Sequence, residues 1–235
     1  MKVGKANVYC FMNELSKVIP EDTPIVSGNG SACVVAASAL LIKKGQRFII
    51  NSGCASMGYD LPASIGVCLS NRKKEMVCIT GEGSIQMNLQ ELQTIVFHKL
   101  PIKIFLINNG GYHSMRQTQN NLFKDLSNIG VGPETGDLSF PDMKKIANAY
   151  GIPYESIHNN TEMDKLGSFI SSEGYGLCEI FVDSEQVFEP KPSTMKLEDG
   201  TLVSPPLENL APFLPKEELE KIMIIPMVDY DITKK

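Results

Sequence analysis

A carboxylate and an amide occupy matching places in two glycine-rich stretches of the chain. Glu82 lies between glycines in "TGEGSIQMN", and Asn109 stands 27 residues later (109 − 82 = 27) in "INNGGY". Carboxylate, amide and backbone carbonyl oxygens are hard ligands of the kind that Mg²⁺ or Ca²⁺ prefers. Gly81, Gly83 and Ser84 leave backbone N–H groups open at an expected helix start, which favours a phosphate. Together the two stretches predict a magnesium ion that bridges protein oxygens to a diphosphate.

The elements around these stretches place both at one edge of a sheet. Apolar runs at 75–80 and 102–108 are typical of strands, and the run at 88–99 is typical of a helix. A right-handed strand–helix–strand unit brings the two strand ends to the same edge. The first stretch alone is more typical of an ordinary strand-to-helix turn. The pairing with the second stretch at this spacing favours a ligand site.

Strand-like and helix-like runs alternate along most of the chain, and the central strands are continuously apolar. Such strands are buried on both faces, so we expect an α/β fold: a doubly wound, mostly parallel sheet with helices on both faces. Ligands bind at the carboxyl ends of the strands in such sheets. Four glycine-rich loops fall there: "SGNGSA", "NSGCASMG", "TGEGSIQ" and "NNGGYHSM". The expected strands cover 23–28, 46–51, 75–80, 102–108, 152–157 and 176–183, and the expected helices 31–45, 59–70, 88–99, 140–151 and 161–172.

Local signals refine two of these helices and the end of the chain. Pro141 and Gly151 lie at the start and end of one helix, and Thr161 is the expected cap of another. From about residue 186 the sequence becomes rich in proline and loses regular period. We therefore expect one domain over 1–185 and an extended C-terminal tail over 186–235, which packs on this or a neighbouring domain. The tail has room for one short helix within 211–223.

Composition excludes several classes of protein. The net charge of −5 gives no reason to expect nucleic acid as a partner, and no apolar run approaches the roughly 20 residues that cross a membrane. Charged and polar residues are spread through the first twenty positions and no small-residue cleavage site follows, so we expect no signal peptide. The three histidines are far apart, which disfavours a histidine-based zinc site. The cysteines form no CxxC pair and indicate a reduced, cytoplasmic protein: Cys10, Cys33, Cys54, Cys68, Cys78 and Cys178.

Three motifs in order resemble the thiamine diphosphate-dependent enzymes. The segment from "GEGSIQMN" to "INNGGY" is similar to that family's Gly-Asp-Gly followed at a distance by Asn-Asn. "NSGCASMGYDLPASIGV" is similar to its Gly-x-Met-Gly-x-x-Leu-Pro-Ala-x-Ile-Gly stretch, and "FPDMKKIANAYGIP" to the acetolactate synthase type. The resemblance covers about residues 5–185. It is to the C-terminal, diphosphate-binding (PP) domain of acetolactate synthases and 2-oxo acid decarboxylases, and implies the thiamin diphosphate-binding fold.

The resemblance implies thiamine diphosphate and Mg²⁺ as cofactors. Glu82, Asn109 and the Gly111 carbonyl stand at the metal-ligand positions. Met57 matches the large apolar residue beneath the cofactor, although packing in the core is an alternative role, and the Ala55 carbonyl would accept a hydrogen bond from the cofactor's amino group. The full set implied for cofactor binding is Asn29, Gly30, Ser31, Ala55, Ser56, Met57, Gly81, Glu82, Gly83, Ser84, Asn109, Gly111 and Tyr112.

The segment after Asn109 faces the substrate in the family. The candidates for substrate contact are therefore His113, Ser114, Met115 and Arg116; an ordinary surface loop and helix face is the alternative for each. Acetolactate synthases carry a tryptophan near the place of Thr118, and this chain has no tryptophan. The resemblance thus implies a small 2-oxo acid as substrate, without selecting between a biosynthetic acetolactate synthase and a relative.

Two departures from the family pattern shape the functional hypothesis. Glu82 replaces the family's aspartate, and the chain has only about 20 residues before its first expected strand, which leaves no room for the pyrimidine-binding (PYR) domain. The activating glutamate belongs to that domain. We therefore expect the PYR domain to come from a separate subunit or from the missing N-terminal part of a longer chain, in an oligomer.

Two alternatives differ in class from this thiamine diphosphate-dependent lyase or transferase. One is a non-catalytic or regulatory cofactor-binding module with a degenerate metal site, which the Glu82 change and the missing PYR domain motivate. The other is a nicotinamide or flavin enzyme of the Rossmann type. "GNGSAC" has Cys33 where that motif needs its third glycine, and no clear acidic residue ends the strand at 46–51, so the second alternative is disfavoured.

Overall fold

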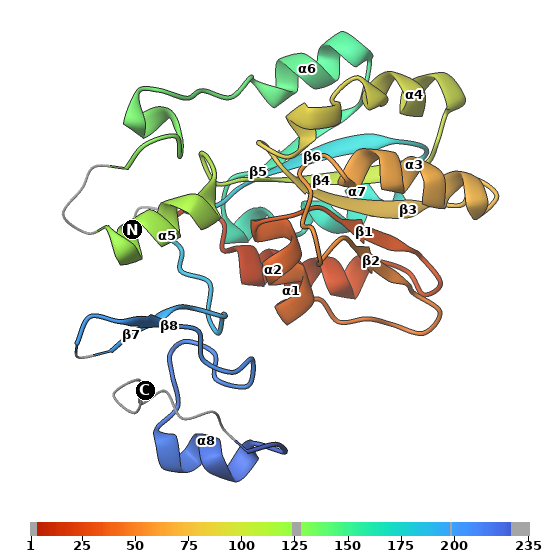
Figure 1. The fold of residues 1–235 in the computed structure, drawn as a ribbon. Helices are drawn as coiled ribbons and strands as arrows, with labels where there is room; N and C mark the ends of the chain where they lie inside the picture. The colour runs from red at the N-terminus through yellow and green to blue at the C-terminus, as the bar shows by residue number, and fades with distance from the viewer. Residues whose placement is uncertain (1–3, 124–127, 198, 227–235) are drawn as a thin grey trace. The chain divides into compact units, whose positions relative to one another are not determined.

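A six-stranded sheet organises the part of the chain up to Gln186 (Figure 1). The structure, a computed structural model, describes residues 4–123, 128–197 and 199–226. All strand pairs in this sheet are parallel, and the strand order is β2-β1-β3-β4-β6-β5. The strands are β1 Ile25–Ser27, β2 Phe48–Ile50, β3 Met76–Gly81, β4 Ile102–Asn108, β5 Tyr154–Ile157 and β6 Gly176–Phe181.

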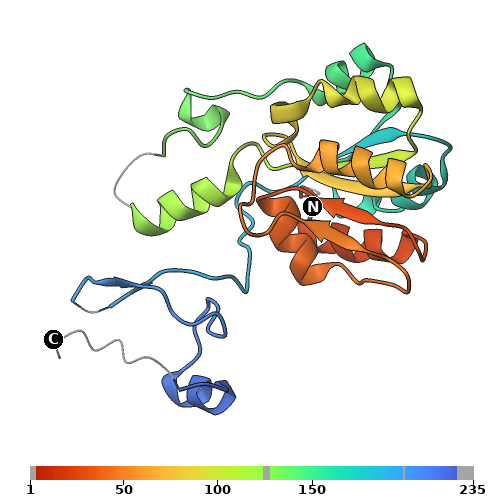
Figure 2. The same cartoon turned by 45° about the vertical axis from the view of Figure 1, so that its right-hand side comes forward.

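Helices cover both faces of the sheet (Figure 1, Figure 2). One face carries α1 Val8–Val18, α2 Ser31–Ala39 and α7 Lys165–Ser171, and the other carries α3 Asp60–Ser70, α4 Glu91–His98 and α6 Met143–Tyr150. Helix α5, His113–Leu122, follows the carboxyl end of β4. Three short 3-10 helices cover Ile85–Asn88, Pro133–Thr135 and Asn160–Glu162.

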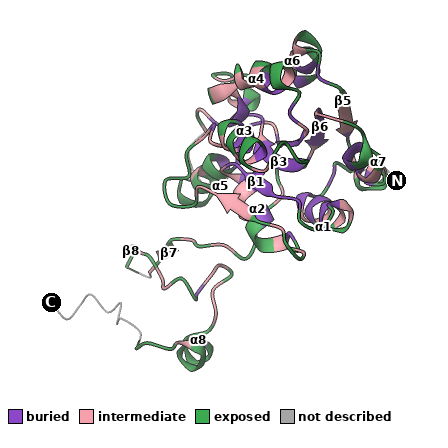
Figure 3. Ribbon diagram, turned by 90° about the vertical axis from the view of Figure 1, so that its right-hand side faces the viewer, coloured by how far each residue is buried: buried purple, intermediate pink, exposed green. Residues whose placement is uncertain are grey.

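Alternate residues of the central strands fill two apolar layers. Cys78 and Ile104 pack with Leu61 of α3 and the helices beside it. On the opposite face, the Phe105 ring lies 5.8 Å from Phe11 and 5.3 Å from Phe169, measured between centroids. Strands β3, β4 and β6 are buried along nearly their whole length, as Figure 3 shows. The doubly wound α/β prediction is therefore confirmed, because continuous apolar strands need cover on both faces.

Several helix boundaries differ from the prediction. Helix α1 was not predicted; Asn7 caps it by accepting hydrogen bonds from the N–H groups of Tyr9 and Cys10. The prediction that a helix continues from Ser31 to Gly45 is wrong. Helix α2 ends at Ala39 because Leu40 is extended (φ −77°, ψ 123°) and the next N–H donates to a serine of α1.

Two predicted helix starts also move. Helix α6 begins after Asp142, whose side chain accepts a hydrogen bond from the Lys145 N–H at 3.0 Å, rather than at Pro141. The predicted cap at Thr161 is wrong, since α7 begins after Asp164 and Thr161 lies in a 3-10 helix. In both helices an aspartate provides the acceptor that the first N–H groups require.

A second compact unit begins at Val187. It contains the antiparallel pair β7 Met195–Lys196 and β8 Leu202–Val203, followed by α8 Lys216–Ile222. The short helix predicted within 211–223 is confirmed, whereas the two-stranded pair was not predicted. Across the described ranges of both units, no helix is long and apolar enough to span a membrane.

Candidate functional site

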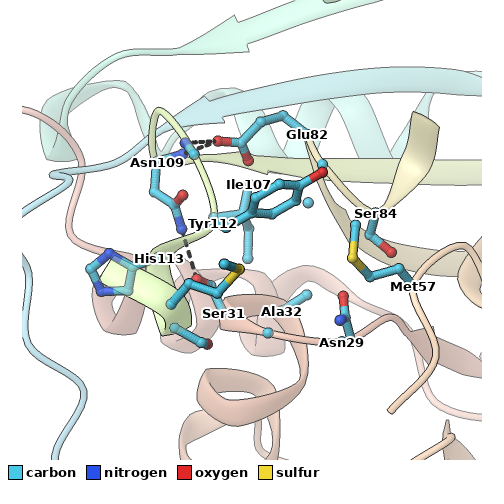
Figure 4. Close-up of a pocket in the computed structure, with 16 residues that line it drawn as sticks. Asn29, Ser31, Ala32, Met57, Glu82, Ser84, Ile107, Asn109, Tyr112 and His113 are labelled. Atoms are coloured by element: carbon cyan, nitrogen blue, oxygen red, sulfur yellow. Dashed lines mark hydrogen bonds between the residues drawn. The ribbon is translucent and has the colours of Figure 1, made fainter. Parts of the chain in front are cut away.

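A cavity of about 250 Å³ opens at the carboxyl ends of the strands (Figure 4). Its walls come from the loops after β1, β2, β3 and β4, which are neighbours in the sheet. The chain passes from β1 to β2 on one side of the sheet and continues through β3 and β4 on the other, so the strand order reverses between β1 and β3. Doubly wound sheets bind ligands at such a reversal point. The lining residues are Asn29, Gly30, Ser31, Ala32, Met57, Gly81, Glu82, Gly83, Ser84, Ile107, Asn109, Gly111, Tyr112, His113, Ser114 and Met115.

Three oxygen-bearing groups converge in this cavity. Figure 4 draws the Asn109 amide with its nitrogen 2.7 Å from Ser31 Oγ. The amide oxygen then lies 3.3 Å from Glu82 Oε1 and 2.6 Å from the Gly111 carbonyl oxygen. An amide oxygen in this place has no hydrogen-bond donor among the two acceptors that it faces, so it would need a cation between them, and without one the amide takes the opposite orientation. Adjacent ligands of an octahedral Mg²⁺, each about 2.0–2.1 Å from the metal, are separated by a similar distance of about 2.9 Å.

The Asn109 amide has a second orientation that suits a protein without metal. When its nitrogen and oxygen exchange places, the nitrogen donates to Glu82 Oε1 and to the Gly111 carbonyl, and the oxygen accepts from Ser31 Oγ. Amide orientation follows from the hydrogen-bond partners that are present. The residues therefore fit a divalent cation, and Asn109 is the group whose orientation depends on it.

Glu82 is buried, with 3% of its surface exposed. Its Oε1 accepts hydrogen bonds from the backbone N–H groups of Gly111 at 2.7 Å and Asn109 at 3.2 Å. Burial raises the pKa of Glu82 to about 7, and these N–H groups oppose that rise only in part. A carboxylate without a nearby positive charge is costly here, and a bound cation would remove that cost.

Two turns that each precede a helix line the cavity. Helix α2 begins at Ser31 after Gly30, which has a positive φ of 61°, and the N-terminus of a helix favours an anion. On the other side, Gly83 and Ser84 form the turn before a 3-10 helix and also line the cavity. Gly83 must lack a side chain, because a Cβ there would lie 2.4 Å from Cε1 of Tyr112. The two turns are suited to a diphosphate.

Comparison with known proteins decides the family. Residues 28–180 match the family described as thiamine pyrophosphate enzyme, C-terminal TPP binding domain. The chain belongs to this family. It is 35% identical to the acetolactate synthase large subunit of Cyanidium caldarium and 31% identical to the isozyme 2 large subunit of Escherichia coli K12, over 74% of this chain in each case. It spans only 29% and 31% of the length of these two relatives.

The thiamine pyrophosphate-binding domain brings most of the predicted residues to one cavity. Of the predicted cofactor set, only Ala55 and Ser56 do not line it; both are exposed, and Ala55 has a positive φ of 49°. Met57 lines the cavity opposite Tyr112 (Figure 4). Two lining residues, Ala32 and Ile107, were not predicted. Both adjoin predicted positions. Ala32 follows Ser31 at the start of a helix, and Ile107 lies near the end of a strand, so these places in the expected elements could have identified them.

The predicted substrate-facing residues divide into two groups. His113, Ser114 and Met115 line the cavity, and the buried His113 ring has Nε2 at 2.8 Å from the Gln186 carbonyl oxygen. Arg116 does not line it. Because α5 begins at His113, Arg116 falls one turn later, on a different side of the helix from Ser114 and Met115.

Arg116 supports the loop after β4 instead of lining the cavity. Its side chain is buried and pairs with Glu134, with Nη2 2.6 Å from Oε1. The same guanidinium donates to the Asn109 carbonyl at 3.4 Å and to the Gly110 carbonyl at 3.1 Å. Arg116 therefore fixes the backbone on which Asn109 and Gly111 lie.

Asp60 is a buried site residue that sequence reasoning missed. It opens α3 directly below the cavity and accepts hydrogen bonds from Thr80 Oγ1 at 2.8 Å and Ser84 Oγ at 2.7 Å. Burial raises its pKa, and these hydrogen bonds oppose the rise. An aspartate at a helix start is ordinarily a cap, so the sequence alone carried no distinguishing signal.

Proposed function

We propose that this chain is the thiamine diphosphate- and Mg²⁺-binding part of an enzyme that decarboxylates a small 2-oxo acid, transfers the resulting acyl unit, or does both. The observation that supports this most directly is the convergence of Glu82 Oε1, the Asn109 amide and the Gly111 carbonyl. The N–H-bearing turns on either side add the positive potential that a diphosphate requires. The family and the acetolactate synthase relatives support the choice of reaction.

Each part of the cavity has a task in this proposal. Glu82, Asn109 and the Gly111 carbonyl would hold Mg²⁺, and the turns at 30–31 and 83–84 would hold the diphosphate. Met57 would support the rings of the cofactor from one side. When bound, thiamine diphosphate supplies the nucleophilic carbon that adds to the carbonyl of a 2-oxo acid and allows CO₂ to leave. The protein binds, orients and excludes water.

The substrate would bind against the cavity wall that the first residues of α5 form. His113, Ser114 and Met115 lie on that wall, and they offer an imidazole, a hydroxyl and an apolar surface respectively. A short 2-oxo acid needs polar groups for its carboxylate and an apolar surface for its alkyl end. We propose these three residues as the contribution of this chain to substrate binding.

Activation of the cofactor would come from elsewhere. The relatives are about three times longer than the matched segment, so the family's enzymes contain further chain that this segment does not represent. We propose that a PYR domain, in a separate polypeptide or in a further segment, supplies the activating glutamate in an oligomer. That glutamate and the cavity of this chain would together form one active site.

Reconstitution tests this function. The full chain is mixed with a PYR-domain polypeptide, thiamine diphosphate and Mg²⁺, and CO₂ release is measured with a panel of short 2-oxo acids. We expect release from the mixture only. Glu82→Gln should abolish it, whereas Glu91→Gln, the same change at the half-buried start of α4 and outside the cavity lining, should not. Release that is unchanged by Glu82→Gln would contradict the proposed metal site.

A cofactor-binding module without catalysis is the second candidate. The glutamate at position 82, where the family has aspartate, favours it because the longer side chain alters a site that demands near-ideal octahedral geometry. The same mixture separates the two candidates. Tight cofactor binding with no CO₂ release from any 2-oxo acid would favour the module over the enzyme.

A further inference from the structure

Asp60 joins three of the loops that form the cavity. Its Oδ2 accepts from Ser84 Oγ in the turn after β3 and from Thr80 Oγ1 at the end of β3. Its Oδ1 accepts from the Leu61 N–H at 2.9 Å, in the first turn of α3. Gly28, in the loop after β1, leaves the space that the carboxylate fills, since a Cβ there would lie 2.2 Å from Oδ2.

The hydroxyl of Ser84 connects Asp60 to the backbone of Gly58, the residue after Met57. Ser84 Oγ donates to Asp60 and accepts from the Gly58 N–H at 2.9 Å. The Gly58 carbonyl in turn accepts from Asn88 Nδ2 at 2.7 Å. Both backbone polar groups of Gly58 are therefore held by side chains of the segment that carries the diphosphate turn.

The direction of these hydrogen bonds depends on Asp60. A carboxylate accepts on both oxygens, so the Ser84 proton points toward Asp60. The Ser84 oxygen is then free to accept from Gly58. Asp60 is fully buried at the first position of α3, where the helix dipole favours a carboxylate.

We infer that Asp60 is a positioning residue that links the diphosphate turn at 81–84 to Met57 through Ser84 and Gly58. The cofactor-binding roles of the turn and of Met57 rest on the proposed function. The hydrogen-bonded link between them is present in the protein without ligand. A ligand that orders the turn would also fix Met57, the apolar support beside it. The diphosphate and ring ends of the cofactor would thereby be held in one geometry.

The variant Asp60→Asn tests the link with little change in volume. The amide has one acceptor where the carboxylate has two, so either the Leu61 N–H or the two hydroxyls lose their acceptor. We expect thiamine diphosphate, titrated with Mg²⁺ in the full chain, to bind 10- to 100-fold more weakly, the range typical of groups that orient ligands from behind. Asp142→Asn, the same change at the start of α6, should leave the affinity within twofold.

A methyl NMR spectrum of methionine-labelled protein separates positioning from a loss of stability. The chain has 11 methionines, and Met57→Leu identifies the Met57 signal. We expect Asp60→Asn and Ser84→Ala each to move the Met57 signal in ligand-free protein, while Met12, buried in α1, stays in place. Ser84→Ala removes the hydrogen bonds of this hydroxyl to Asp60 and Gly58, leaves those of Asp60 with Thr80 and Leu61, and serves if Asp60→Asn does not fold.

The outcomes are distinct for the two proposals. An unmoved Met57 signal in both variants, or an affinity of Asp60→Asn within twofold of the unchanged chain, would overturn the positioning role. If the unchanged chain binds no cofactor even with a PYR-domain polypeptide present, the proposed function fails, and the ligand-free Met57 spectrum still decides whether the link exists.

Discussion

Glu82 Oε1 accepts a hydrogen bond of 2.7 Å from the backbone N–H of Gly111, so a carboxylate after β3 fixes the backbone after β4. These loops end neighbouring strands, which pair in parallel from Met76–Ile102 to Gly81–Ile107. The register therefore brings the two loops together, and Gly111 allows the close approach. Its φ of 151° and its contact with the Val131 carbonyl exclude a side chain.

The metal site makes a first prediction. Glu82→Gln removes the charge that balances Mg²⁺, so we expect Mg²⁺ affinity at saturating thiamine diphosphate to fall by at least about 10-fold. Glu82→Asp keeps the carboxylate, which is the ligand type of the family, and should retain Mg²⁺-dependent binding. Calorimetric titration with MgCl₂ measures both. Equal affinity in the Gln variant would remove Glu82 from the ligand set.

The buried carboxylate makes a second prediction, on pH. Because the pKa of Glu82 rises from 4.5 to about 7 on folding, the folded state retains a proton that the unfolded state releases. The contribution of Glu82 to the free energy of unfolding is therefore fully present below pH 4.5. It falls by about 3 kcal/mol in total as the pH rises from 4.5 through 7. Mg²⁺ with thiamine diphosphate should restore stability above pH 7.

Urea unfolding at pH 5 and pH 8 measures this effect. The comparison with Glu82→Gln isolates it, because Asp60 and other groups titrate equally in both proteins. We expect the Gln variant to lose less stability than the unchanged chain between the two pH values. The same loss in both proteins would show that Glu82 ionises normally.

Arg116 provides a third prediction. Arg116→Ala leaves the carbonyls of Asn109 and Gly110 without their donor in a buried place, so we expect a loss of about 2–4 kcal/mol in the free energy of unfolding and weaker Mg²⁺ binding. Glu134→Gln should cost less than about 1 kcal/mol, because the Glu134 side chain is 47% exposed. If urea unfolding gave the same loss for Arg116→Ala and Glu134→Gln, the stability would come from the ion pair rather than from the contacts of Arg116 with the carbonyls.

The contact between Gly83 and Tyr112 provides a fourth. Gly83 is outside the left-handed region, so Gly83→Ala is strained only by the ring 2.4 Å from the new Cβ. We expect a cost of about 1–3 kcal/mol, as for other overpacked sites. The double variant Gly83→Ala/Tyr112→Leu should recover more than half of it. If the double variant were no more stable in thermal unfolding than Gly83→Ala alone, contact with the Tyr112 ring would not explain the cost of a side chain at position 83.

The sequence was most informative where burial was continuous. The run "IKIFLIN" predicted β4 over 102–108, and the structure has the same bounds, because a central strand buried on both faces is apolar along most of its length. The apolar run after Ser31 was misleading. Helix α2 ends at Ala39, and Leu41 and Ile42 are exposed, so apolar character there does not report helical packing.

The site was predictable to the extent that its residues lie at strand ends. Glycine-rich loops with Glu82 and Asn109 could be recognised, and both residues line the cavity. The supporting residues could not. Arg116 contacts Glu134, which lies 18 positions later in the chain, and Asp60 contacts Ser84, which lies 24 positions later. Such pairings depend on tertiary packing rather than on local pattern.

Titration of the full chain with thiamine diphosphate in a calorimeter, with MgCl₂ and then with a chelator, tests the central claim most directly. We expect one saturable site in the presence of Mg²⁺, and its loss when the metal is removed or Glu82 is replaced by Gln. Absence of binding with Mg²⁺ even when a PYR-domain polypeptide is present, or binding that is unchanged by the chelator, would contradict the claim.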